Sequence, residues 1–154
     1  MWFVSCEILD PRFDEESPGL VFSPKKTELS LNDSAIISLN AFGVDSIASL
    51  QATIIYDSSS LKVLNVNQGE FFFDSGAAPI FVFDNDIKGE LHIYVVFLGD
   101  KMSVEGLGVI ANIEFSPIKN GSHIFTISED SYMLDSFAEE VELESFGNGL
   151  IVVK

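Results

Sequence analysis

Alternation of apolar and polar residues at every second position is the feature that most constrains the fold of this chain. Ala111, Ile113 and Phe115, for example, alternate with Asn112 and Glu114. A period of two places all the apolar side chains on one side of an extended strand, so that side faces a core. The same period recurs in the stretches 29–31, 35–41, 50–56 and 91–97. The chain therefore predicts a series of half-buried strands.

Clusters of Asn, Asp, Gly and Ser separate these strands and predict turns. Asn120-Gly121 is the strongest signal for a short hairpin. One short helical candidate, from Asp135 to Glu142, has no long apolar stripe of helical period. The pattern predicts an all-β fold, a sandwich of about nine strands whose two inner faces pack together.

The length of 154 residues suits a single domain. Prolines and acids crowd residues 1–19, which we expect to be a tether, and residues 20–154 form the predicted sandwich. Val4 and Ser5 precede Cys6 as in the end of a lipoprotein signal, which makes Cys6 a candidate lipid anchor. This segment is either the trimmed remnant of such a signal or a chance match.

The net charge argues against several kinds of partner. Eight Lys and Arg residues face 24 Asp and Glu residues, a formal net charge of -16. Such a surface repels nucleic acid and anionic membranes, and no apolar run approaches the roughly 20 residues of a membrane span. The acidity either keeps an extracellular protein soluble or speeds its encounter with a basic partner.

The chain carries little that suggests catalysis. Asp84-Asn85-Asp86 starts like a calcium loop, but Val95 occupies the position where such a loop needs Glu, so a hairpin turn fits better. The Gly-x-Ser-x-Gly signature of a hydrolase nucleophile is missing. We expect no enzyme activity, no metal and no cofactor. Paired carboxylates for glycoside hydrolysis are the alternative that the sequence leaves open.

A set of motifs in a fixed order resembles a known family. The motifs are LVFSP (20–24), LQATIIYDSSSLKVLNVNQGEFF (50–72), GELHIYVVF (89–97), GLGVIANIEF (106–115) and GNGLIVV (147–153). Their order and spacing resemble the bacterial cohesin modules of cellulosomes over residues 20–153. One departure is Ser58, where the family usually has proline after Tyr-Asp. The resemblance implies jelly-roll topology.

The resemblance also implies a function and a site. Cohesins bind dockerins, which are small helical modules, through one flat sheet face. Matching the family's contact positions gives Ser49 and Gln51, and parity adds Thr53. In the stretch 91–98, alternation leaves His92, Tyr94 and Val96 outward, although a slip of one residue would invert that face. The predicted partner-binding residues are Ser49, Gln51, Thr53, His92, Tyr94 and Val96.

Two functions follow from this reading. The first is a non-catalytic, monomeric interaction module that binds a dockerin or similar partner outside the cell or at its surface. The second is a carbohydrate-binding or adhesin module of the related jelly-roll type. The second needs exposed flat rings, yet Trp2 lies in the predicted tether and most other aromatic residues are phenylalanines, which usually fill cores.

Overall fold

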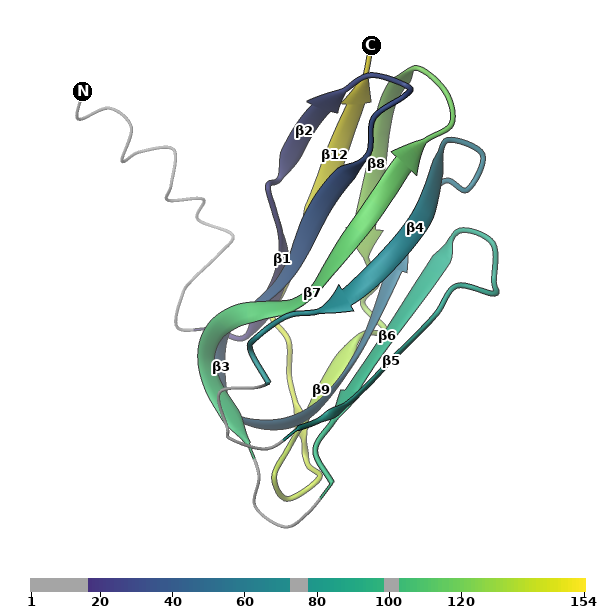
Figure 1. The fold of residues 1–154 in the computed structure, drawn as a ribbon. Helices are drawn as coiled ribbons and strands as arrows, with labels where there is room; N and C mark the ends of the chain where they lie inside the picture. The colour runs from purple at the N-terminus through teal and green to yellow at the C-terminus, as the bar shows by residue number, and fades with distance from the viewer. Residues whose placement is uncertain (1–16, 73–77, 99–102) are drawn as a thin grey trace, which may run out of the picture.

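The computed structural model describes residues 17–72, 78–98 and 103–154, and within these ranges it contains strands and no helix. The strands are β1 (Gly19–Ser23), β2 (Lys26–Leu29), β3 (Ala35–Ile55), β4 (Leu61–Gln68), β5 (Ile80–Asp84), β6 (Glu90–Val96), β7 (Val104–Pro117), β8 (Gly121–Ile127), β9 (Tyr132–Asp135), β10 (Glu140–Val141), β11 (Ser145–Phe146) and β12 (Asn148–Val153). Figure 1 shows them in two layers, which confirms the predicted all-β sandwich. Trp2, Cys6 and most of the predicted tether lie outside the described residues.

β3 is a single strand of 21 residues that belongs to both layers. Its first half pairs with β1 and β7, and its second half pairs with β6, β9 and the end of β8. Gly43 and Ser46 have positive φ angles of 64° and 54°, and the pairing with β7 shifts register around them. Such bulges bend a strand, so β3 turns from one sheet into the other (Figure 1).

The two sheets share β3 and are otherwise built from different strands. The first sheet contains β4, β7, the first half of β3, β1 and β11. The second contains β5, β6, the second half of β3, β9 and β10. β8 pairs with β12, which pairs in turn with β2. The sequence predicted about nine strands; the structure joins two of them in β3 and adds several short ones.

Phenylalanine rings fill the space between the sheets. Phe125 lies fully buried, with its ring centroid 4.6 Å from that of Phe22 and 5.1 Å from that of Phe115. Phe72 and Phe97 pack together at 5.4 Å. These contacts join segments that are far apart in the sequence, as expected for an interior that packs as densely as an organic crystal. The core role predicted for the phenylalanines is confirmed for these rings.

The turn after β3 is organised by a carboxylate. Ser59 donates its hydroxyl and its N–H to Asp57 Oδ1 at 2.6 and 2.9 Å, and the Ser60 hydroxyl donates to Oδ2 at 2.8 Å. The Ser59 hydroxyl, and then the Ser60 hydroxyl, lower the pKa of Asp57 from 3.8 to about 2. The chain then enters β4, where Leu61 and Val63 are buried.

Two local expectations are wrong. The segment expected as a helix from Asp135 is the β9–β10 hairpin, because Asp135 Oδ1 accepts the N–H groups of Phe137 and Glu139 at 2.8 and 2.9 Å and closes a tight turn. Asn120-Gly121 does not join paired strands. It links β7 to β8, and β7 pairs with β3 and β4 instead. A turn signal fixes where the chain reverses, but it does not fix which sheet the next strand joins.

Candidate docking face

The second sheet presents one side to the core and the other to solvent. β5, β6, the second half of β3 and β9 lie next to one another in that order. Side chains of residues that pair directly across antiparallel strands project to the same side of the sheet. The pairing register therefore decides which side chains share the solvent side, which we call the docking face.

The docking face consists of three rows that run across the strands. The polar row is Asp84, His92 and Thr53; the tyrosine row is Val82, Tyr94, Gln51 and Tyr132; the apolar row is Ile80, Val96, Ser49 and Leu134. Glu90 pairs with Ile55 just beyond the polar row. The face is thus charged at one end of the strands and mainly apolar at the other.

The six residues predicted to bind a partner all project from this face. The register of β6, which the sequence left open, follows from the burial of Leu91, Ile93 and Val95 on the core side. Thr53 differs from the others in its exposure. Its relative exposure is only 6%, so it supports the face from below and offers little surface to a partner.

Sequence reasoning missed several residues of the docking face. They are Ile80, Val82, Asp84, Glu90, Tyr132 and Leu134. β5 reads IFVFD, which is apolar at four consecutive positions and shows no alternation. It is an edge strand that pairs with β6, and its second side, where Val82 lies, stays in solvent. A strand with apolar residues on both sides carries no period that identifies the exposed one.

Apolar and aromatic side chains give the face its exposed anchors. Val82 is 50% exposed and Tyr94 38%, although both belong to regular strands. Ser49, Gln51, Tyr94 and Tyr132 surround a shallow hollow of about 230 Å³. Exposed apolar groups beside a polar rim are typical of protein-interaction surfaces.

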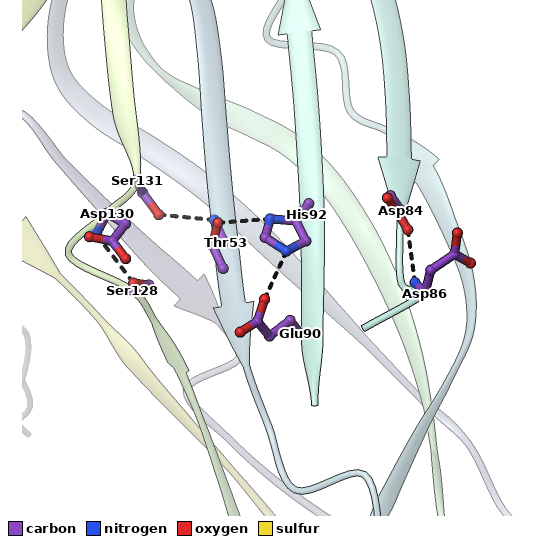
Figure 2. A network of polar contacts seen from close by, with 8 residues as sticks. All are labelled: Thr53, Asp84, Asp86, Glu90, His92, Ser128, Asp130 and Ser131. Carbon is purple, nitrogen blue, oxygen red and sulfur yellow. Dashed lines mark hydrogen bonds and ion pairs between the residues drawn. The ribbon is translucent and has the colours of Figure 1, made fainter. Parts of the chain in front are cut away.

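A chain of hydrogen bonds crosses the charged end of the face (Figure 2). Ser131 Oγ accepts the N–H of Thr53 at 3.0 Å, Thr53 Oγ1 lies 3.1 Å from His92 Nδ1, and His92 Nε2 lies 3.0 Å from Glu90 Oε2. A carboxylate only accepts, so Nε2 carries a proton toward Glu90; in the neutral ring Nδ1 then accepts the Thr53 hydroxyl. The His92 ring also stacks on Tyr94, with 6.3 Å between centroids and 11° between planes.

The order hydroxyl, imidazole, carboxylate is also that of a hydrolase triad. Thr53 is buried, however, with a relative exposure of only 6%. A nucleophile must reach a substrate carbonyl, which this hydroxyl does not. These hydrogen bonds instead fix the orientation of His92 and Glu90 on the docking face.

A turn between β8 and β9 lies beside this network of hydrogen bonds and supports it. Ser128 donates its N–H to Thr53 O at 2.8 Å, Ser131 donates its N–H to Ser128 O at 3.0 Å, and Asp130 donates its N–H to Ser128 Oγ at 3.2 Å. These bonds replace part of the ladder that a continuous strand would form. Glu129 and Asp130 in this turn are exposed, and the Asp130 side chain lies beside Ser128 (Figure 2).

The described residues contain no group of three or more His, Cys, Asp or Glu side chains arranged to hold a metal ion. Asp84 Oδ1 instead accepts the N–H of Asp86 at 2.8 Å, which closes the turn after β5. Among the same residues, no helix is long and apolar enough to cross a membrane.

The fold defines the class: a β-sandwich domain with one level sheet face exposed to solvent. The sequence pattern of the cohesin domain matches residues 22–149. The chain therefore belongs to the cohesin domain family, as its motifs suggested. A comparison with curated proteins gives no match.

Solved structures agree with this assignment at the level of the fold. The sixth cohesin of scaffoldin B from Acetivibrio cellulolyticus, solved with a Cel5 dockerin mutant, has a TM-score of 0.74 at 18% identity, covering 90% of this chain and 99% of that one. A non-cellulosomal cohesin from the archaeon Archaeoglobus fulgidus has a TM-score of 0.73 at 14% identity, covering 90% and 91%. A type I cohesin–dockerin complex from Clostridium thermocellum gives 0.71 at 17% identity, covering 90% and 95%.

Proposed function

We propose that this chain is a non-catalytic interaction module that binds a dockerin, or a similar small helical module, through the docking face. The observation that carries the proposal is the exposure of Val82 and Tyr94 on a regular sheet within a cohesin fold. Two structurally similar cohesins were solved in complex with dockerins. A helical partner would lay its apolar side over the tyrosine and apolar rows.

The architecture suits such a partner physically. Backbone pairing on both sides holds β6 and the second half of β3 in place, so little ordering entropy is lost on binding. Most of the affinity of an interface comes from a few central anchors, often aromatic. Tyr94 and Val82 are the anchors here, and Gln51, between two tyrosines, sets the partner's orientation through its amide.

We place this interaction in an extracellular or cell-surface assembly, with Cys6 as the candidate point of attachment. The net charge of -16 supports this in two ways. It keeps the module soluble, and it speeds encounter with a positively charged partner.

Calorimetry with a dockerin tests the proposal. The double variant Gln51→Ala, Tyr94→Ala should bind at least about tenfold more weakly than the parent, because it loses a central anchor. A matched double variant on the first sheet, Ile36→Ala with Glu114→Ala, should bind like the parent. Both should keep melting temperatures within a few degrees of the parent. Equal affinities for the two variants would show that the partner binds elsewhere.

The glycan-binding alternative needs rings that lie free and flat on the face. Tyr94 is stacked on His92 and Tyr132 is half-buried, which favours the protein partner. A pull-down on insoluble cellulose separates the two functions. Retention on cellulose that is lost in Tyr94→Ala would favour the glycan.

A further inference from the structure

Glu90 lies at the charged end of the docking face, in an environment that the proposed function does not yet explain. Its Oε2 accepts a hydrogen bond from His92 Nε2, with 3.0 Å between the two atoms, and its side chain remains 37% exposed. His92 is held in turn by Thr53, and Thr53 by Ser131, both of which are buried. The carboxylate is therefore presented to solvent in a fixed position.

A neutral imidazole donates a hydrogen bond to one acceptor site of a carboxylate, but it does not neutralise the negative charge. A partner that covers the docking face would remove water from Glu90. Covering an ionised carboxylate is costly unless a cation pairs with it. The partner must then supply that cation, or binding is penalised.

The surroundings of Glu90 strengthen this requirement. Asp84 lies on the same face, opposite His92 in the register, and Asp130 is exposed in the supporting turn between β8 and β9 (Figure 2). Lys88, in the turn between β5 and β6, is exposed and forms no ion pair with any described residue. Two further carboxylates therefore lie at this end of the face, and among the described residues Lys88 does not neutralise Glu90 through an ion pair.

We propose that Glu90 is a specificity determinant of the docking face: it selects partners that place a Lys or Arg side chain over the polar row, and His92, Thr53 and Ser131 position its carboxylate. This inference rests on the proposed function and adds the chemistry of the partner. The apolar row fixes the other end of the partner.

The test uses a displayed panel of dockerin modules, which includes the Cel5 dockerin of Acetivibrio cellulolyticus. Binders of the parent protein are selected, and their affinities are measured by calorimetry. Glu90→Gln, which keeps the shape and removes the charge, should weaken binding about tenfold or more and lower its salt dependence. Glu114→Gln, on the first sheet, is the matched control and should change affinity less than about twofold.

A charge exchange identifies the partner's cation. Glu90→Lys should abolish binding, and Glu substituted for one Lys or Arg of the selected dockerin should restore it. Thr53→Val removes the hydroxyl that holds His92. It should weaken binding by about threefold to tenfold. In the Thr53→Val background, Glu90→Gln should also reduce the affinity by less than it does in the parent, because the carboxylate is no longer held in place.

The outcomes separate this inference from the proposed function. If a dockerin binds the parent and Glu90→Gln equally well, Glu90 is no determinant, although the module still binds dockerins. If Glu90→Gln weakens binding but no Lys or Arg of the dockerin affects the affinity, Glu90 does not act by pairing with a cation and the inference is wrong. If no dockerin in the panel binds, the proposed function fails and the inference fails with it.

Discussion

A charge placed on the docking face gives the sharpest test of where the partner binds. Val82 is 50% exposed in the tyrosine row, so a partner that covers it buries about half a valine side chain, which contributes about 1 kcal/mol. Val82→Asp loses this contribution and leaves a carboxylate covered without a partner, a further cost of about 1–3 kcal/mol. The sum of about 2–4 kcal/mol predicts binding about 30- to 1,000-fold weaker.

Ile36→Asp is the matched control. Ile36 is 62% exposed, but it lies on the first sheet, opposite Glu114 of β7. Calorimetry should give this control an affinity within about twofold of the parent. Both variants should melt within about 2 °C of the parent, because exposed substitutions change stability little. Parent-like affinity of Val82→Asp would refute the assignment of the face.

Two further predictions concern the scaffold. In Gly149→Ala the new Cβ would lie 2.0 Å from the ring of Phe125, which the core holds in place; we expect a loss of about 1–3 kcal/mol. Differential scanning calorimetry should show a melting point lower by about 2–10 °C, and Phe125→Leu, which makes room, should reduce the added effect of Gly149→Ala. Asp57 has a folded pKa of about 2, below its ordinary 3.8, so its contribution to stability is present above about pH 4 and is lost as the pH falls toward 2. Urea unfolding should therefore show Asp57→Asn less stable than the parent at pH 5, with the difference shrinking between pH 4 and pH 2; a constant difference would contradict the hydrogen-bonded carboxylate.

The position of the polar row also has a consequence for association. The charged end of the face holds Asp84 and Glu90, and the opposite end holds Ile80 and Val96. Long-range attraction acts on the first end before apolar contact forms at the second. A cationic partner should therefore associate more slowly at high salt, while its apolar contacts still limit dissociation.

The alternation of apolar and polar residues identified the strands that have one buried and one solvent-exposed side. On β7, Ile113 and Phe115 are buried, while Asn112 and Glu114 face outward. On β5 and β6 the signal failed to separate the sides, because apolar residues lie on both. Tyr94 and Val96 are outward only because Leu91 and Ile93 pair with the core side of β3. Pairing between strands, which is non-local, settled that register.

Glu90 shows most clearly what a sequence leaves out. It is one of 24 acidic residues, and no local pattern distinguishes it from the others. Its position depends on Thr53, which is 37 positions earlier in the chain, and on Ser131, which is 41 positions later. Only the folded sheet brings these residues together, through bonds of 3.0 and 3.1 Å.

The sequence by itself determined the two-sided strands, the phenylalanine core and the family, because burial of alternate side chains is a local property written along each strand. The tertiary structure alone decided that β3 bends from one sheet into the other and which side chains share the docking face. It also decided which carboxylate is held in place there. The reason is physical: strand order and register depend on which distant segments pair and exclude water together, and no short window of sequence contains that information.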